Sequence, residues 1–201
     1  MNNELFGGVF YINLEHRQDR KEEIENELNK MELKYKRFNA FHHEFGIAGC
    51  TKSHLEVIKL AKEQKLKNVL IFEDDFESLV SKDVFWKEIN NFFNKNIDYD
   101  VLMLGYNLHQ YKSFDDQLYK IIHLDSPSGY IVNEKFYDQL IECWETHLPL
   151  LISTRNWQLY ANDAIMNKIV PQNKWYALKT RIGKQRSSFS DIRQMYIERE
   201  W

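Results

Sequence analysis

Short apolar runs alternate with amphipathic segments along the first half of the chain. The runs are rich in β-branched and aromatic residues, which favours strands, and they cover residues 8–14, 35–41, 68–75 and 99–105. Between the first two runs, Ile24, Leu28 and Met31 recur at helical spacing behind Asp19, which can cap a helix. This half of the chain therefore predicts strands that alternate with helices.

Two more helices are predicted in the same half. Thr51 is expected to cap a helix that runs to Lys65, after a loop over 42–50 that contains two glycines. Asp83 is expected to open a helix whose apolar side carries several phenylalanines.

The second half predicts strands over 118–124, 128–133 and 175–179, with helices over 134–148 and 162–169. Alternating strands and helices indicate an α/β fold, and continuous apolar strands indicate a sheet that is covered on both faces. We therefore expect a mixed, mainly parallel sheet flanked by helices. No repeat, low-complexity tract or linker divides the chain, so a single domain over 1–201 is expected.

Composition narrows the possible functions. Hydrophobic residues make up 43% and charged residues 28% of the 201 positions, which is an ordinary globular mixture. The formal net charge of −3 gives no basic surplus for nucleic acid binding. The two cysteines form no disulfide framework and suit a reducing compartment. We see neither a signal peptide nor a transmembrane segment, and we expect a cytoplasmic protein.

Three carboxylates, Glu73, Asp74 and Asp75, follow the apolar strand residues 69–72. Adjacent negative charges repel one another unless a cation neutralises them. If the extended backbone persists through the cluster, strand alternation would put Glu73 and Asp75 on one side and Asp74 on the other. Mn²⁺ and Mg²⁺ prefer oxygen ligands, so the cluster indicates either a metal site or a solvated acidic turn.

Four ordered segments carry a resemblance to a known family. They are "YINLEHRQDR" (11–20), "GIAGCTKSH" (46–54), "LIFEDDF" (70–76), and "SGYIVNEKFYDQLI" followed by "NDAIM" and "QRSSFSDI". Together they resemble glycosyltransferase family 25, which includes lipopolysaccharide and collagen hydroxylysine galactosyltransferases. One departure is Ile47, which stands where the family usually has glutamate.

The resemblance implies a GT-A-like fold, a nucleotide-sugar donor and a divalent metal, Mn²⁺ or Mg²⁺. Asp75 is then the expected metal ligand, with Glu73 beside it, and Glu73 and Asp74 would also contact the donor. The strand end at Asn13 and Leu14 would hold the nucleotide.

Further residues of the matched segments would serve the same donor. Arg17 and Arg20 would meet its phosphates, because a guanidinium is planar and permanently charged. Ser53 and His54, expected in the first turn of a helix, would approach a phosphate, or would only cap and pack that helix. Gln185 and Arg186 would close over the pyrophosphate from a mobile tail.

The resemblance also implies transfer with inversion, which needs a group that accepts the acceptor hydroxyl proton. Asp163, where the family has a matching aspartate, is the candidate for this general base. The alternative role for Asp163 is a first-turn helix carboxylate. The resulting hypothesis is a metal-dependent inverting transferase that moves galactose or glucose from a UDP-sugar. The acceptor would be a glycan, a lipid-linked saccharide or a hydroxylysine-type protein site. A metal-dependent phosphohydrolase and an inactive nucleotide- or glycan-binding module are the alternatives.

Overall fold

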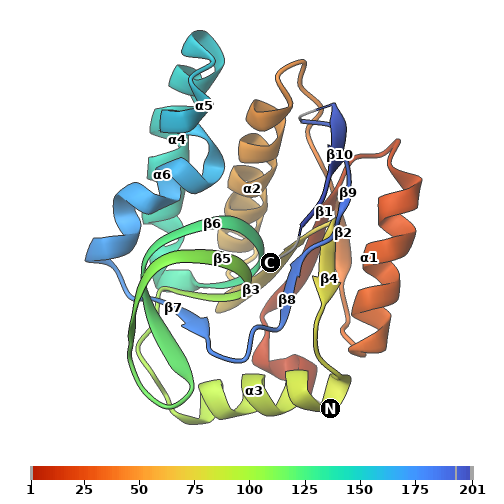
Figure 1. The fold of residues 1–201 in the computed structure, drawn as a ribbon. Helices are drawn as coiled ribbons and strands as arrows, with labels where there is room; N and C mark the ends of the chain where they lie inside the picture. Colours follow the sequence, from red (N-terminus) through yellow and green to blue (C-terminus); the bar gives the residue numbers. More distant parts are fainter. Residues whose placement is uncertain (1, 193, 200–201) are drawn as a thin grey trace.

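The computed structural model describes residues 2–192 and 194–199, and its framework is one eight-stranded sheet (Figure 1). The strands lie in the order β2-β1-β3-β6-β7-β5-β8-β4, and β9 and β10 form a separate hairpin. The strands are β1 (Gly8–Asn13), β2 (Lys36–Asn39), β3 (Asn68–Glu73), β4 (Phe76–Ser78), β5 (Val101–Ser113), β6 (Leu118–Asn133), β7 (Trp175–Leu178), β8 (Gly183–Gln185), β9 (Ser188–Ser190) and β10 (Met195–Ile197). The helices are α1 (Gln18–Lys30), α2 (Gly46–Glu63), α3 (Lys82–Asn94), α4 (Tyr137–Thr154), α5 (Trp157–Tyr160) and α6 (Asn162–Ile169).

The sheet is mixed, as the alternation of strands and helices predicts. Strand β1 pairs in parallel with β2 and β3, and β5 pairs in parallel with β7 and β8. Strand β6 runs antiparallel to β3, β5 and β7. The carboxyl ends of β2, β1 and β3 therefore meet at one edge, where ligands bind in open α/β sheets.

Strands β5 and β6 form a long, strongly curved hairpin (Figure 1). Its register shifts at several points between Met103 and Tyr111, and such bulges bend and twist a strand pair. The sequence predicted two strands over 118–124 and 128–133, but the structure has one continuous strand there. The left-handed backbone at Ser126, with φ of 55°, bends that strand without ending it.

Two apolar cores cover the two faces of the sheet. Side chains of α2, α4 and α6 pack on one face, and side chains of α1 and α3 pack on the other. Strand β3 contributes side chains to both cores. Val69 and Ile71 belong to the first core, and Leu70 and Phe72 belong to the second. The expectation of a sheet covered on both faces is confirmed, while the single domain over 1–201 stays a prediction. Among the described residues, no helix has the length and apolar character needed to span a membrane.

The start of α2 differs from the sequence prediction. The helix begins at Gly46, so the expected cap Thr51 lies inside it and donates its hydroxyl hydrogen bond to the carbonyl of Ile47. Two glycines in the segment indicated a loop, yet Gly49 is needed within the helix. A Cβ at Gly49 would lie 2.4 Å from the carbonyl oxygen of Phe41, so only glycine allows this close backbone contact.

Two other helix starts also shift by a few residues. Arg17 precedes α1 as its N-terminal flanking residue, and Asp19 lies in the first turn. Ser81 caps α3 by accepting a hydrogen bond from the Val84 amide, which places Asp83 inside the helix. Both acidic residues still lie where the helix dipole favours negative charge.

Phe76 fixes the chain directly after the three carboxylates. Its ring is fully buried against Phe72, with ring centroids 4.6 Å apart. A Cβ at Gly183 of β8 would lie 2.2 Å from the Phe76 ring, so glycine makes the space that the ring fills. The backbone of β4 then pairs with β8, Phe76 opposite Gln185. This packing holds the segment after β3 beside the tail of the chain.

Replacing Gly183 by alanine should destabilise the protein by about 1–3 kcal/mol, because the added methyl group overpacks the Phe76 pocket. Urea unfolding of the wild type and of Gly183→Ala, Phe76→Leu and the double variant measures this. The smaller leucine should relieve part of the clash, so the two substitutions should not be additive. Strict additivity would contradict the proposed contact.

Candidate functional site

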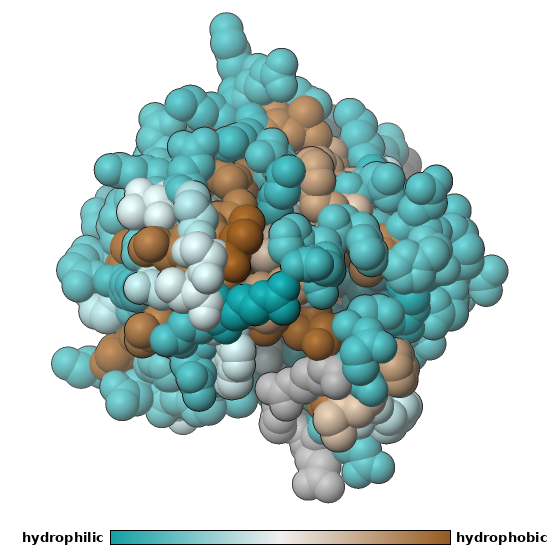
Figure 2. Space-filling view, turned by 90° about the horizontal axis from the view of Figure 1, so that it is seen from above, coloured by the Kyte–Doolittle hydropathy of each residue, from teal (hydrophilic) through white to brown (hydrophobic). Residues whose placement is uncertain are grey.

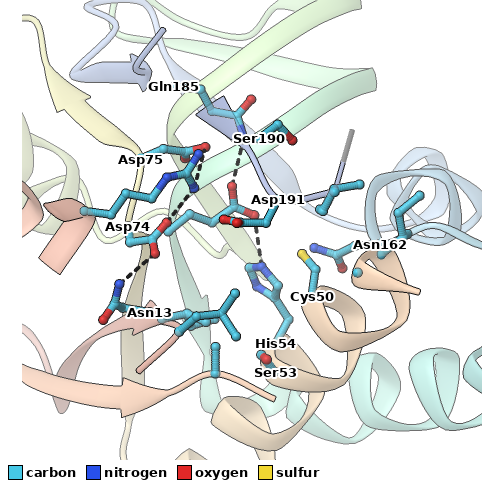
Figure 3. Close-up of a pocket in the computed structure, with 18 of the residues that line it drawn as sticks. Asn13, Cys50, Ser53, His54, Asp74, Asp75, Asn162, Gln185, Ser190 and Asp191 are labelled. Atoms are coloured by element: carbon cyan, nitrogen blue, oxygen red, sulfur yellow. Dashed lines mark hydrogen bonds and ion pairs between the residues drawn. The ribbon is translucent and has the colours of Figure 1, made fainter. Parts of the chain in front are cut away.

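The carboxyl ends of β1 and β3 open into a cleft of about 850 Å³. Most of the residues predicted to form the site line it: Asn13, Leu14, Arg20, Ser53, His54, Glu73, Asp74, Asp75, Asp163, Gln185 and Arg186. Figure 3 shows Asn13, His54, Asp74, Asp75 and Gln185 converging on this space from separate elements. Seen from above, the surface of the molecule is mostly hydrophilic, with separate hydrophobic patches (Figure 2).

The chain turns immediately after Glu73, and this changes the expected direction of Asp74. Strand β3 ends at Glu73 and β4 begins at Phe76, so strand alternation does not extend through the cluster. Asp74 lines the cleft, where it accepts hydrogen bonds from the Asn13 amide at 2.8 Å and from Arg20 at 2.9 Å. The expectation that Asp74 faces away from the other two carboxylates is therefore wrong.

Arg20 is the cation that holds the cluster together. Its guanidinium Nη1 lies 2.9 Å from Asp74 and 3.7 Å from Asp75, and all three side chains are nearly buried. The other end of the same group, Nη2, donates to the Ser188 hydroxyl and to the Phe189 carbonyl, both at 2.8 Å. Arg20 thus ties the carboxylates to the C-terminal tail.

Asp75 remains the least compensated of the three carboxylates. Its Oδ1 is buried and accepts no hydrogen bond within the described part of the chain. Burial and the neighbouring charge of Glu73 raise the pKa of Asp75 to about 8, although Arg20 opposes the shift. A buried carboxylate oxygen without a partner, beside a second carboxylate, fits a divalent cation that prefers oxygen ligands.

Glu73 is held by a buried chain of side chains. The His54 ring lies 2.6 Å from the Tyr130 hydroxyl through Nδ1 and 3.1 Å from Glu73 through Nε2. Gln185 donates to the other oxygen of Glu73 at 2.9 Å (Figure 3). Burial would raise the pKa of Glu73, but the hydrogen bonds from His54 and Gln185 hold it below its ordinary value. Glu73 therefore stays ionised and fixed in position.

The placement of Ser53 and His54 in a first helical turn is wrong. Because α2 begins at Gly46, both residues lie in its interior and are fully buried. The Ser53 hydroxyl donates to the Gly49 carbonyl and accepts from the Phe41 amide. Neither residue therefore lies at the helix N-terminus, where a phosphate would bind. The His54 ring contacts Glu73 instead.

Cys50, one turn before His54 on α2, is a residue of the site that sequence reasoning did not select. Ligand atoms of Cys50, His54 and Glu73 lie within 4.8 Å of one another, which is close enough to share a metal ion. The spacing of Cys50 and His54, four residues apart on a helix, was the available signal. Thiolate and imidazole suit Zn²⁺, whereas the Glu73 and Asp75 carboxylates suit Mn²⁺ or Mg²⁺.

The two arginines at the edges of the site have other partners. Arg17 donates two hydrogen bonds to Asp19, at 2.7 and 2.9 Å, and pairs with Asp191 in the tail, so its guanidinium lies beside the cleft. Arg186 lines the cleft while pairing with Glu27 at 3.2 Å. Its backbone amide donates to the Asp75 carbonyl at 2.6 Å. Contacts to donor phosphates stay a prediction for both arginines.

Asp163 lies on the opposite wall of the cleft, in the first turn of α6. Burial raises its pKa and the nearby charge of Asp125 adds to the effect, while the Ala164 amide opposes it by donating to Asp163 at 2.9 Å. Ser126 and Pro127 of β6 also line the cleft. An acid whose pKa is moved toward neutrality suits proton transfer.

Comparison with known proteins agrees with this geometry. No family model matches the chain. It is 26% identical to procollagen galactosyltransferase 1-A of Xenopus laevis over a region that covers 50% of this chain. The chain spans about a fifth of that relative's length, since the match covers 21% of it. The sequence resemblance to the galactosyltransferases is thus confirmed as a distant homology.

Solved structures extend the likeness to the whole chain. A glycosyltransferase involved in glycosylation of the major capsid of PBCV-1 superposes with a TM-score of 0.55, covering 93% of this chain and 95% of that one at 10% identity. The chain has a GT-A-like fold, a mixed sheet flanked by helices. The protein A197 from STIV also superposes, with a TM-score of 0.54 over 96% of this chain and 94% of that one at 12% identity.

The folded, metal-free protein should lose stability as the pH rises from about 5 to about 8. The folded-state pKa of Asp75 is about 8 and its ordinary value is 3.8, so between these limits the folded state binds more protons than the unfolded state. The free energy of unfolding then falls with rising pH. Asp75→Asn removes the carboxyl group that binds this proton, so the free energy of unfolding should fall less as the pH rises.

Urea unfolding at several pH values, with a chelator present, compares the two proteins. Asp116→Asn is the matched control, because this carboxylate is 89% exposed on a distant turn. It should reproduce the wild-type pH dependence. Parallel curves for the wild type and Asp75→Asn would show that Asp75 does not hold the extra proton.

Proposed function

We propose that this protein is a metal-dependent inverting glycosyltransferase that moves galactose or glucose from a UDP-sugar to an acceptor hydroxyl. The observation that carries the proposal is a buried Asp75 oxygen that has no hydrogen-bond partner among the described residues. It lies beside Glu73, at the carboxyl ends of parallel strands in a glycosyltransferase-like fold. The distant homology to a procollagen galactosyltransferase supports the same class of reaction.

Donor binding would centre on the three carboxylates. Asp75 and Glu73 would hold Mn²⁺ or Mg²⁺, which supplies positive charge to the diphosphate that leaves with the nucleotide. Arg20 supplies a fixed guanidinium on the same wall and keeps Asp74 and Asp75 in place. Leu14 and Asn13, at the end of β1, would form the wall beside the nucleotide.

Asp163 would accept the proton of the acceptor hydroxyl as that oxygen bonds to the anomeric carbon of the donor sugar. The bond from this carbon to the diphosphate oxygen breaks in the same displacement, so the configuration inverts and no sugar–enzyme bond forms. Burial suits Asp163 to this role, because it raises the pKa of the base toward the pH of the solution. The acceptor would be a glycan, a lipid-linked saccharide or a hydroxylysine side chain.

Ile47 is the observation that favours the alternative, a binding module without transferase activity. It lines the cleft at the start of α2, where the family resemblance leads one to expect a glutamate. The carboxylates and Asp163 are nevertheless all present in the cleft. Tight UDP binding without transfer or hydrolysis of any UDP-hexose would favour this alternative.

UDP with Mn²⁺ should raise the melting temperature by about 5–10 °C at a concentration near one hundred times Kd, because ligand that binds only the folded state stabilises it by mass action. Either component alone should have a smaller effect. Asp75→Asn should abolish the part of the melting-temperature shift that requires UDP and Mn²⁺ together, whereas Asp116→Asn should retain it. A full shift in Asp75→Asn would rule out Asp75 as a ligand of the metal.

Asp163→Asn should lower kcat for sugar transfer by about 10²–10⁴-fold, the usual contribution of a general base. Mn²⁺-dependent UDP binding should persist, since Asp163 lies on the wall opposite the three carboxylates. Asp138→Asn is the control, because Asp138 is also a first-turn helix carboxylate but is 78% exposed. If Asp163→Asn turned over like the wild type, another group would have to accept the proton.

A further inference from the structure

The cleft does not end at Asp163 but continues into a second cavity of about 510 Å³. Ser126, Trp157 and Asp163 line both spaces, so the two cavities meet at the junction of β6, α5 and α6. A volume of this size is in the range of small-molecule sites. The proposed base therefore stands between the donor cleft and a separate chamber.

Asn162 lies next to the proposed base in the sequence, and it carries a carboxamide group. Its side chain lines the cleft and is 6% exposed. Neither Oδ1 nor Nδ2 has a hydrogen-bond partner among the residues that the structure describes. Figure 3 shows the Asn162 side chain at the cleft wall near Cys50. A buried amide that leaves both a donor and an acceptor unpaired costs free energy, unless a ligand supplies the missing partners.

Trp157 provides an apolar surface at the same junction. The residue is 48% exposed, although tryptophan is mostly buried in folded proteins. It begins the short helix α5 and lines both cavities. An exposed indole in a cavity that also holds a few polar groups is typical of sites that bind a flat apolar ligand face with polar edges.

Charge at the junction favours an uncharged ligand. The second cavity is lined by the acidic residues Asp125 and Asp163 and by the basic residues Lys168 and Arg199. These formal charges balance, so the lining offers no net attraction to an ammonium group or to a phosphate. A pyranose ring matches all these features, since it has an apolar face of C–H groups and a rim of neutral hydroxyls.

We propose that the acceptor of this enzyme is a hexopyranoside whose ring stacks on Trp157 and whose vicinal hydroxyls pair with the Asn162 amide. One hydroxyl of the pair donates to Oδ1 and its neighbour accepts from Nδ2, which places the reacting hydroxyl beside Asp163. The second cavity holds the rest of the acceptor. The inference rests on the proposed transferase function and chooses a glycan over a hydroxylysine side chain.

The test measures transfer from UDP-galactose and UDP-glucose, with Mn²⁺, to two kinds of acceptor. These are nitrophenyl hexopyranosides and a peptide that contains hydroxylysine. The hexopyranosides should be acceptors. Trp157→Ala and Asn162→Ala should each raise the KM for them by about tenfold or more, with the donor KM changed less than about twofold. Trp157→Phe should have an acceptor KM close to that of the wild type, because phenylalanine keeps an aromatic face that alanine lacks.

Tyr111→Ala is the matched control, since this aromatic residue of β5 is also 48% exposed but lines neither cavity. It should leave both KM values unchanged. Circular dichroism and melting temperatures establish that the variants fold. Asn162→Asp keeps the shape of the side chain but loses the N–H donors, so its acceptor KM should also rise.

The outcomes separate this inference from the function on which it rests. Mn²⁺-dependent UDP binding together with transfer only to the hydroxylysine peptide would overturn the inference and leave the proposed function standing. Acceptor KM values that stay unchanged in both Trp157→Ala and Asn162→Ala would also overturn it. Absence of UDP binding in the wild type would remove the proposed function and the inference together.

Discussion

Burying negative charge at the end of β3 is the constraint on which the rest of the site depends. Three consecutive carboxylates leave the solvent together, and each buried charge needs a partner. Arg20 and Asn13 satisfy Asp74, and His54 and Gln185 satisfy Glu73, with partners drawn from α1, β1, α2 and β8. Asp75 is left with one oxygen that has no hydrogen-bond partner in the part of the chain that the structure describes. The fold thus compensates two carboxylates internally and presents the third to the cleft.

Several features of the fold serve this arrangement. Helix α2 starts early and passes close under the loop after β2, a contact that Gly49 permits, and this brings His54 to Glu73. Phe76 fills the space left by Gly183 and so anchors the chain directly after the turn at Asp74 and Asp75. Strand β8 then brings Gln185 back to Glu73. Elements that are distant in the sequence are needed to hold one short acidic segment.

The two walls of the cleft have different chemistry, and this division suits transfer between two substrates. The wall at β1 and β3 carries the carboxylates, Arg20 and the strand ends, which suit a charged nucleotide with its metal. The wall at α5 and α6 carries an exposed indole, an amide without a hydrogen-bond partner among the described residues, and one acid with a raised pKa, which suit a neutral partner. Asp163 stands where the two regions meet.

The family resemblance alone selected Asp163, whereas the sequence by itself determined the alternation of strands and helices, the sheet with two covered faces and the gathering of Asn13, Glu73 and Asp75 at one cleft. These follow from local patterns, because hydrophobic periodicity sets the elements and parallel strands bring their carboxyl ends together. Only the tertiary structure decided where α2 begins, how Asp74 points and what Arg17 and His54 contact. Those features depend on close packing and charge pairing between residues far apart in the chain, as between Gly49 and Phe41 or Arg20 and Asp74, and no local pattern encodes such contacts.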